Sequence, residues 1–337
     1  MWSIVIIENN MTRDKTIELE AGAGGEKSNG LISDIRKNFK IPSKWKNLED
    51  DGASYELGKK KLVFTTDAFI VDPIFFPGGD IGKIAMCGTI NDLSVMGAKP
   101  IGISLSLVIE EGFPEEDLKK IIASISKVSR ETGVPIVTGD TKVTEKGKLD
   151  KIEITTSGIG LAGKIISNNG AMPGDVVISS GNLGEHAVAL LAKRFNYKTK
   201  IKSDCKPLNK EIQSVAKYLT AAKDPTRGGA AEVLNEIAEK SKVKIVLEEN
   251  NLSFAKETAA LSGLLGIDKF SFPSEGRFLA TVPQKDAKKV LATLKRFNKE
   301  AKTIGRVEKG RGVYLETSIG GLKKIDMPRG KLIPRIC

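Results

Sequence analysis

One stretch rich in glycine, asparagine and proline divides the chain into two parts of similar length. It spans residues 163–175, and its turn-forming members are Ser167, Asn168, Asn169, Gly170, Pro173 and Gly174. Such a concentration of turn formers indicates a domain boundary. On both sides of it, short β-branched runs alternate with segments of helical spacing. The sequence therefore predicts an α/β (α+β) protein of two domains.

The expected elements follow from periodicity, helix-capping residues and β-branched runs. Before the boundary we expect strands over 2–9, 61–66, 101–109, 134–137 and 151–160, a glycine-rich loop over 22–30, and helices over 31–39, 81–96 and 114–132. Beyond it we expect strands over 176–179, 244–247, 278–282, 303–307 and 312–316, and helices over 185–194, 210–222, 229–240, 254–265 and 284–297.

Proline and glycine mark the end of the chain as different from the rest. Residues 326–337 contain Pro328, Gly330 and Pro334, which predicts an extended, flexible tail rather than a packed element. The predicted organisation is thus an N-terminal segment 1–40, domains over 41–165 and 166–325, and a tail over 326–337.

Counts of reactive residues exclude several kinds of site. The chain has one histidine, His186, which excludes zinc or iron sites that need two imidazoles. Its three cysteines, Cys87, Cys205 and Cys337, are far apart and form no CxxC motif. Neither a disulfide framework nor a thiolate metal site is indicated. We assign His186 no catalytic role.

Charge and hydropathy set the expected environment. The formal net charge is +11, but the lysines are interleaved with acids and aromatic residues make up only 5% of the chain. A solvated lysine-rich surface is therefore favoured over a nucleic-acid groove. The longest apolar stretch, 101–109, is too short to span a bilayer, and residues 2–7 lack the flanks of a signal peptide. We expect a cytoplasmic protein that binds neither membrane nor nucleic acid.

A glycine-rich segment near the N-terminus is a candidate phosphate loop. Residues 21–28 read Ala-Gly-Ala-Gly-Gly-Glu-Lys-Ser. Glycines allow backbone N–H groups to approach anionic oxygens. The segment fits neither the Walker A motif nor GxGxxG, because Glu26 and Lys27 occupy glycine positions. Taken alone, a phosphate contact and a plain turn both remain open.

Four aspartates in distinctive local sequences form a candidate metal set. They are Asp67, Asp92, Asp140 and Asp224, each expected at a strand end or helix start. Carboxylates suit a hard ion such as Mg²⁺, which bridges phosphate oxygens. Each aspartate taken singly could also be a helix cap or turn residue. Together they favour a nucleotide–metal site.

The last residue is a cysteine, in the sequence Pro-Arg-Ile-Cys337. An exposed terminal thiol is a liability unless it is used. Arg335 would favour its thiolate, whereas the terminal carboxylate would oppose it. The alternatives are a chance end residue and a covalent attachment point on a movable arm.

These motifs together resemble the HypE-type hydrogenase maturation factors, within the superfamily of aminoimidazole ribonucleotide synthetase, selenophosphate synthetase and thiamine-monophosphate kinase. The matching segments are 22–25, 64–67, 73–83, 88–97, 110–114, 137–143, 224–229, 275–276 and 334–337. PIFFPGGDIGK and the terminal PRIC are specific to the HypE type. Three positions depart from the family pattern: Ala21 replaces a loop histidine, Glu185-His186-Ala187 replaces Asp-His-Gly, and Arg277 replaces a lysine.

The resemblance implies an ATP-dependent carbamoyl dehydratase. Its N-terminal domain would bind ATP and pair with that of a second chain into a β-barrel, giving a homodimer. The carbamoyltransferase HypF would load the terminal thiol, Mg²⁺-ATP would drive dehydration to a protein thiocyanate, and a HypC–HypD scaffold would accept cyanide for the nickel–iron centre. Alternatives are a small-molecule kinase or ligase of the same superfamily, and a basic scaffold without chemistry.

The resemblance also assigns roles to individual residues. Cys337 would be the carrier, Glu275 the base and Lys142 a charge-neutralising group. Phosphate and ATP contacts would come from Gly22, Gly24, Gly25, Asn91, Thr226 and Arg227. Metal ligands would be Asp67, Asp92, Asp140 and Asp224. For Glu275, burial near Phe272 and Phe278 would raise the carboxyl pKa into a useful range.

Overall fold

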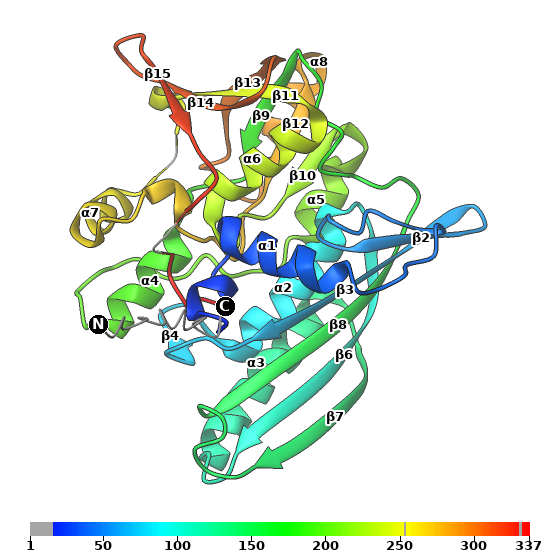
Figure 1. The fold of residues 1–337 in the computed structure, drawn as a ribbon, viewed down its shortest axis with the longest axis vertical. Helices are drawn as coiled ribbons and strands as arrows, with labels where there is room; N and C mark the ends of the chain where they lie inside the picture. Colours follow the sequence, from blue (N-terminus) through cyan, green and yellow to red (C-terminus); the bar gives the residue numbers. More distant parts are fainter. Residues whose placement is uncertain (1–15, 253, 330–331) are drawn as a thin grey trace, which may run out of the picture.

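A computed structural model of the chain describes residues 16–252, 254–329 and 332–337. The strand expected over 2–9 lies outside this range. Two sheets, each accompanied by helices, are joined by the segment 163–174 (Figure 1). This is the mixed α/β arrangement that the sequence predicts. Within the described residues, no helix combines the length and apolar character needed to cross a bilayer.

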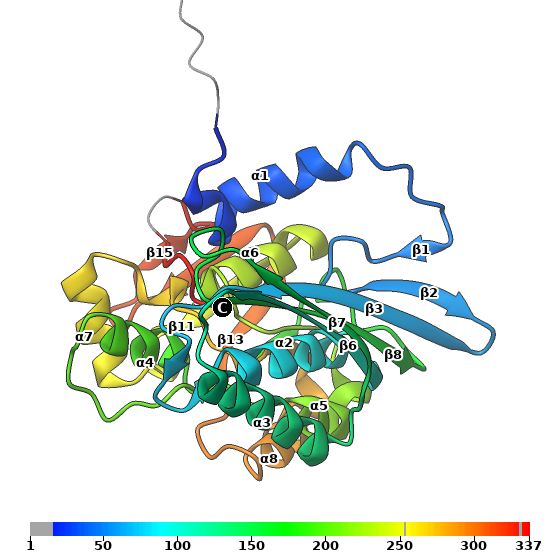
Figure 2. The ribbon, with the colours of Figure 1, turned by 90° about the horizontal axis from the view of Figure 1, so that it is seen from below.

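The first sheet has six strands in the order β1-β2-β3-β8-β6-β7, of which only β6 and β7 run parallel. The elements of this half are η1 (Leu19–Gly22), α1 (Gly25–Arg36), β1 (Trp45–Lys46), β2 (Ala53–Leu57), β3 (Lys60–Phe69), β4 (Phe75–Phe76), β5 (Gly79–Asp80), α2 (Ile81–Val95), β6 (Lys99–Glu110), α3 (Glu115–Thr132), β7 (Ile136–Thr144) and β8 (Ile152–Ala162). In Figure 2, α2 and α3 lie on one side of the sheet and α1 on the other.

Helix α2 is the core element of this half. Asp80 caps it by accepting a 3.0 Å hydrogen bond from the backbone N–H of Lys83. All but two of its residues are buried, the exceptions being Lys83 and Asp92. A helix that is apolar around most of its circumference must be covered on several sides. Asp92, although only partly buried, therefore projects from a rigid, enclosed element.

The second sheet has seven strands in the order β10-β12-β9-β13-β11-β14-β15. Its elements are β9 (Asp175–Ser179), α4 (Glu185–Arg194), α5 (Asn209–Val215), η2 (Ala216–Tyr218), β10 (Ala221–Lys223), α6 (Gly229–Ser241), β11 (Val243–Glu248), η3 (Glu249–Asn251), α7 (Lys256–Leu265), η4 (Lys269–Ser271), β12 (Leu279–Pro283), α8 (Gln284–Leu294), β13 (Lys302–Lys309), β14 (Gly312–Glu316) and β15 (Leu322–Ile325). One apolar cluster packs α6 against the sheet, and another packs α5 and α8. The sheet is thus covered on both faces.

Several expected elements have different bounds in the structure. The helix expected over 210–222 ends as α5 at Val215, and residues 221–223 form strand β10, which pairs with β12. Helix α1 begins at Gly25, so two thirds of the expected glycine-rich loop, residues 25–30 of 22–30, are helical. Strand β3 continues through Asp67, and β7 continues through Asp140, so neither aspartate ends a strand. Glycine and polar residues suggested turns at these places, but pairing with neighbouring strands prolongs both strands.

The C-terminal tail packs against the body of the protein. Its described residues 332–337 end near the centre of the molecule, where the C-terminus lies (Figure 1). Ile333 and Ile336 are buried in an apolar cluster that contains residues of both halves, including Ile84 and Leu190. The prediction of an unpacked tail is therefore wrong for residues 332–337, because the two isoleucines outweigh the proline and glycine signals. Its flexibility stays a prediction.

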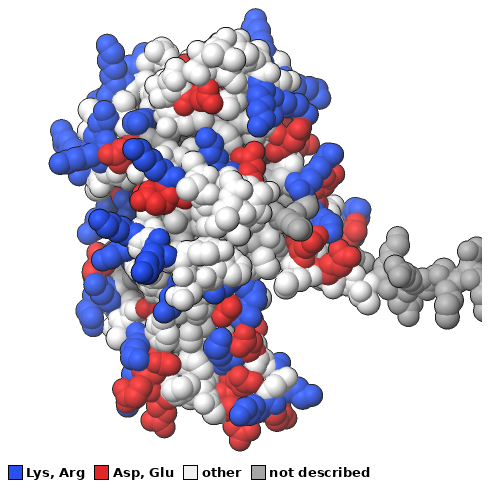
Figure 3. Space-filling view, turned by 90° about the vertical axis from the view of Figure 1, so that its left-hand side faces the viewer, with Lys and Arg blue, Asp and Glu red and all other residues white. Residues whose placement is uncertain are grey.

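Basic and acidic side chains are intermingled on the face shown in Figure 3. Exposed lysines commonly pair with nearby acids, as Lys119 does with Glu116 at 2.7 Å and Lys120 with Asp117 at 2.8 Å. This is the solvated, mixed-charge surface that the interleaved sequence predicts.

Candidate active site

Four carboxylates converge where the two halves meet. Asp92 comes from α2, Asp224 directly follows β10, and Asp51 lies in the turn before β2; their nearest oxygens all lie within 4.8 Å of one another. Asp67, on β3, lies beside them and accepts a 3.4 Å hydrogen bond from Thr89 Oγ1. Three of the four predicted ligands are thus together, and Asp51 joins them.

The cluster carries more negative charge than its surroundings neutralise. Burial raises the pKa of Asp92, and the neighbouring charges of Asp67, Asp224 and Asp51 raise it further. Burial and the charge of Asp51 raise the pKa of Asp224 to about 8. One oxygen each of Asp51 and Asp224 is buried without a hydrogen-bond partner. Uncompensated carboxylate oxygens at this spacing fit a divalent cation such as Mg²⁺.

Two cations border the cluster. Lys223 forms an ion pair with Asp51 and another with Glu236 at 3.4 Å. Burial opposes the charge of Lys223, but Asp51 and Glu236 outweigh it, so the lysine pKa is raised and the ammonium stays charged. Arg227 lies in the turn before α6, next to Thr226, a predicted ATP contact. The nearby Cys337 and the carboxylates of Asp67, Glu232 and Asp92 raise the pKa of its guanidinium, which burial opposes.

The terminal thiol lies beside this cluster. Burial raises the pKa of the Cys337 thiol, and the nearby Glu275 carboxylate raises it further, while Arg227 opposes the shift. The charges of Asp67 and Asp224 also act on it. The chain end therefore lies among the predicted base, the predicted arginine and the predicted metal ligands, although about 60 to 270 residues of sequence separate them from it.

Glu275 is held rigidly with its carboxylate free. Its backbone N–H donates to Asp204 Oδ1 at 2.8 Å, and its backbone carbonyl accepts from Asn91 Nδ2 at 3.2 Å. The side chain is buried and its Oε1 has no hydrogen-bond partner. Burial raises the pKa of Glu275, as expected beside the buried Phe272 and Phe278. A desolvated carboxyl group with an open oxygen suits proton transfer.

The Asn91 side chain makes structural hydrogen bonds, and its contact with ATP stays a prediction. Its Nδ2 donates to the carbonyls of Lys206 and Glu275, both at 3.2 Å, and its Oδ1 accepts from the N–H of Leu208 at 2.7 Å. The side chain is fully buried. Asn91 therefore ties α2 to the backbone that carries Glu275.

The glycine loop lies at the edge of the same site. Gly24 and Gly25 have φ of 92° and 72°, and a Cβ at Gly25 would lie 2.5 Å from the carbonyl oxygen of Pro328. The Gly25 N–H donates to both carboxylate oxygens of Glu232, at 3.0 and 2.9 Å. Gly22 ends η1 in open space. The start of α1 thus binds an anionic group beside Arg227, as helix N-termini do.

Asp140 and Lys142 lie away from the acid cluster in the structure. Both are exposed on β7 and pair with each other at 3.2 Å. In the sheet order, β8 and β6 separate β7 from β3 and Asp67. Three strand spacings amount to roughly 14 Å. The prediction that they join the acid cluster is therefore wrong within one chain, because β7 is an edge strand.

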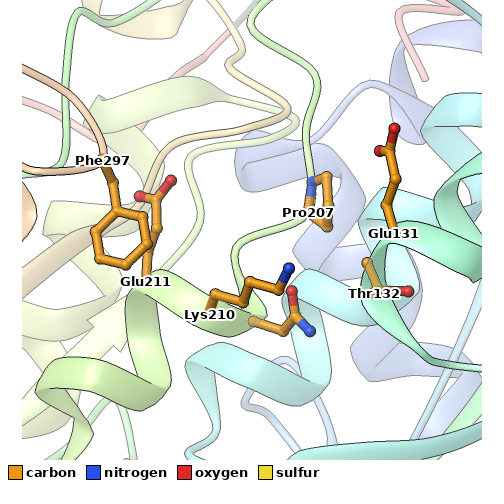
Figure 4. A pocket seen from close by; sticks show the side chains of 7 residues that line it. Glu131, Thr132, Pro207, Lys210, Glu211 and Phe297 are labelled. Carbon is orange, nitrogen blue, oxygen red and sulfur yellow. The ribbon is translucent and has the colours of Figure 1, made fainter.

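A separate pocket lies between the end of α3, the start of α5 and the segment after α8. Its lining includes Glu131, Lys210, Glu211 and Phe297 (Figure 4). None of the predicted site residues lines it. The convergence of charge and thiol, rather than this pocket, marks the candidate active site.

Known proteins share this architecture over the whole chain. Residues 49–162 match the N-terminal domain of AIR synthase related proteins, and residues 172–318 match the C-terminal domain. A carbamoyl dehydratase HypE from Cupriavidus necator is 41% identical over 333 residues, which cover 95% of this chain and 95% of the relative. The chain belongs to the HypE family.

Two solved HypE structures are also similar. A chain in the crystal structure of a HypE–HypF complex has a TM-score of 0.83 at 39% identity, covering 88% of this chain and 99% of that one. HypE solved in complex with ATP has a TM-score of 0.80 at 36% identity, covering 96% and 100%. The HypE fold thus accommodates ATP in that relative.

Asp51 and Glu232 belong to the site but are not among the residues that the sequence motifs predict. Asp51 belongs to an Asp-Asp-Gly turn directly before an alternating strand, a signal similar to those of the other acids. Glu232 lies one turn into α6 after the Asp-Pro-Thr-Arg-Gly-Gly motif, and only the tertiary structure brings it to Gly25.

Proposed function

We propose that this HypE-family chain uses ATP to dehydrate a carbamoyl group carried on its own C-terminal cysteine, in the maturation of nickel–iron hydrogenase. The observation that carries the proposal is the position of Cys337, half-buried beside Glu275, Arg227 and the acid cluster. A free small-molecule substrate would not require the last residue of the chain at this place.

The reaction removes an oxygen that is a poor leaving group by itself. The γ-phosphoryl group of ATP moves to the carbonyl oxygen of the thiocarbamate. The C–O bond then breaks, phosphate leaves with that oxygen, and the nitrogen loses two protons to give the thiocyanate. ATP is converted to ADP. The oxygen of the lost water leaves in phosphate, and its two hydrogens leave as the protons released from nitrogen.

Each residue of the site has a place in this scheme. The sulfur of Cys337 carries the carbon, and Glu275 accepts an N–H proton. Asp51, Asp67, Asp92 and Asp224 would hold Mg²⁺, which neutralises charge on the phosphates when bound. Arg227 and Thr226 would contact the phosphates, and the loop at Gly22, Gly24 and Gly25 would cover them once the Gly25 N–H exchanges Glu232 for a phosphate oxygen.

Mass spectrometry of the C-terminal peptide tests this proposal. With HypF, carbamoyl phosphate and ATP, the peptide ending in Cys337 is expected to gain one carbamoyl group and then lose water. Cys87 and Cys205, both buried, serve as internal controls and should stay unmodified. Modification of either control in place of Cys337 would contradict the proposal.

A homodimer is the second part of the proposal. Among the described residues, strand β7 is an edge of the first sheet, paired only with β6. Its residues from Val137 to Val143 are all exposed, and the apolar Val137 and Val143 are 60% and 70% exposed. An exposed apolar edge strand favours pairing with another chain. Since β7 is far from Asp67 in one chain, a catalytic role for Asp140 and Lys142 would require the second copy.

A charged residue on β7 tests the dimer. Val143→Asp would place a carboxylate in the proposed interface and is expected to shift the sedimenting species from dimer to monomer. Ile122→Asp, on the exposed side of α3, is the control and should leave the mass unchanged. A wild-type chain that sediments as a monomer would overturn this part. The other proposed partners are HypF, as carbamoyl donor, and a HypC–HypD complex, as cyanide acceptor.

A further inference from the structure

The backbone of the last four residues is bound at every carbonyl. Arg194 Nη1 donates to Pro334 O at 3.1 Å, and Arg194 Nη2 donates to Arg335 O at 2.8 Å. The N–H of Asp72 also donates to Arg335 O at 3.1 Å, His186 Nε2 lies 2.8 Å from Ile336 O, and the N–H of Ile70 donates to Cys337 O at 3.3 Å. The tail is thus seated by its main chain.

We propose that Arg194 and His186 form a latch that holds the tail in its dehydrating position, and that they act as positioning residues without touching the reacting atoms. The inference rests on the proposed function and concerns how the same site is loaded. The two residues stand at opposite ends of α4, which spans Glu185–Arg194. One helix therefore holds the tail at two points, about 12 Å apart along its axis.

Arg194 joins the tail to the body of the protein. Besides its two tail carbonyls, its Nε donates to the carbonyl of Asp72 at 2.9 Å. The planar guanidinium presents several donors in a fixed geometry, which a lysine cannot reproduce. A second contact lies on the tail side, where Arg335 pairs with Asp150 at 2.7 Å.

His186 is fixed in one tautomer by its two partners. A carbonyl oxygen can only accept, so Nε2 carries the proton that is donated to Ile336 O. Nδ1 then accepts from the hydroxyl of Ser203 at 2.8 Å, and that hydroxyl oxygen accepts from the N–H of Cys205 at 3.1 Å. The ring is fully buried and forms a T-shaped pair with the ring of Phe76, with the centroids 5.3 Å apart. Every polar atom of this arrangement is satisfied.

The latch recognises carbonyl groups of the main chain rather than the sulfur. A free, carbamoylated or dehydrated Cys337 can therefore be seated in the same way. The seated Cys337 is half-buried and packs against the apolar cluster formed by both halves, which restricts the approach of a carbamoyl donor to its sulfur. Loading then requires the tail to leave the latch, and dehydration requires it to return.

The latch is tested by a substitution that should leave loading of the thiol intact, or speed it, while slowing dehydration. Arg194→Ala removes two hydrogen bonds from a charged donor to the tail and is expected to raise the rate of Cys337 alkylation by iodoacetamide about tenfold. It should slow the single-turnover dehydration of carbamoylated protein, at saturating ATP, by a similar factor. Carbamoylation by HypF should be as fast as in the wild type or faster. Arg194→Lys should have alkylation and dehydration rates between those of the wild type and those of Arg194→Ala.

Matched variants separate a latch from a general structural role. Lys193→Ala changes the neighbouring exposed charge at the same helix end and should behave as the wild type in all three assays. His186→Gln, which keeps a donor and an acceptor, should be less affected than His186→Phe. Unchanged alkylation in Arg194→Ala, or a parallel fall of loading, dehydration and ATP binding, would overturn the latch. If the wild-type chain never loses water, the proposed function fails, while the alkylation assay still reports on the latch.

Discussion

Replacing Glu275 with glutamine is expected to slow the loss of water from carbamoylated Cys337 by about 10²–10⁴-fold, the usual contribution of a positioned acid–base group. The first step, transfer of the carbamoyl group to the thiol, should be unaffected. Burial raises the pKa of Glu275, so glutamine closely resembles the protonated form and should not disturb the fold. The measurement is a single-turnover time course of the C-terminal peptide by mass spectrometry.

The pH dependence makes this prediction sharper. A base acts in its ionised form, and the pKa of Glu275 is raised above its ordinary value. The wild-type dehydration rate should therefore increase with pH through a range above that of an exposed glutamate, and this limb should be absent in Glu275→Gln. Glu211→Gln, at another buried glutamate that binds Lys206, is the control. Normal dehydration in Glu275→Gln would remove Glu275 as the base.

Asp92→Asn is expected to slow dehydration about as much as Glu275→Gln does. In contrast, it should raise the stability of the fold when Mg²⁺ is absent. Loss of a carboxylate from the acid cluster should weaken Mg²⁺ binding and slow dehydration at least ~100-fold, since a metal supplies several kcal/mol of charge stabilisation. Carbamoylation should persist. Asparagine can still accept the 2.9 Å hydrogen bond that Thr65 Oγ1 donates to Asp92 Oδ2.

The stability effect follows from the sign of the pKa shift. Burial and three neighbouring carboxylates raise the pKa of Asp92, so its ionised form destabilises the fold at pH values above the pKa of the unfolded chain. A neutral amide removes this cost. Without Mg²⁺, Asp92→Asn should raise Tm by roughly 2–4 °C for each kcal/mol regained. With Mg²⁺, the wild type should gain stability and the variant should gain little.

An exposed aspartate provides the control for these measurements. Asp34→Asn, at a side chain that is 75% exposed, should change neither Tm nor its response to Mg²⁺. A lower Tm for Asp92→Asn without Mg²⁺, or an undiminished response to Mg²⁺, would contradict the assignment of the cluster as a cation site.

The sequence predicts the elements of this fold better than the contacts between them. Helix α3 begins after Pro114 and ends at Gly133, which has a left-handed φ of 71°, because both signals are local. The extended bounds of β3 and β7 depend on strand pairing, which residues far away in the chain provide. Local propensity does not carry that information.

In the candidate site, too, local motifs predict individual residues better than they predict which residues come together. Asp67, Asp92, Asp224, Glu275 and Cys337 were recognisable from their local motifs, and the structure brings them together. Asp140 carries an equally clear motif but lies on an edge strand away from the cluster. Arg194 has no local signal at all, because its partners are main-chain carbonyls more than a hundred residues away. Such a role becomes visible only when the tail is placed.

The fate of one oxygen atom tests the central claim most directly. The chain, HypF and ATP are supplied with carbamoyl phosphate labelled with oxygen-18 at its carbonyl, and inorganic phosphate released after loading is analysed by mass spectrometry. The account predicts that the label appears in phosphate in proportion to the water lost from the Cys337 peptide. Label released into water, with unlabelled phosphate, would contradict it.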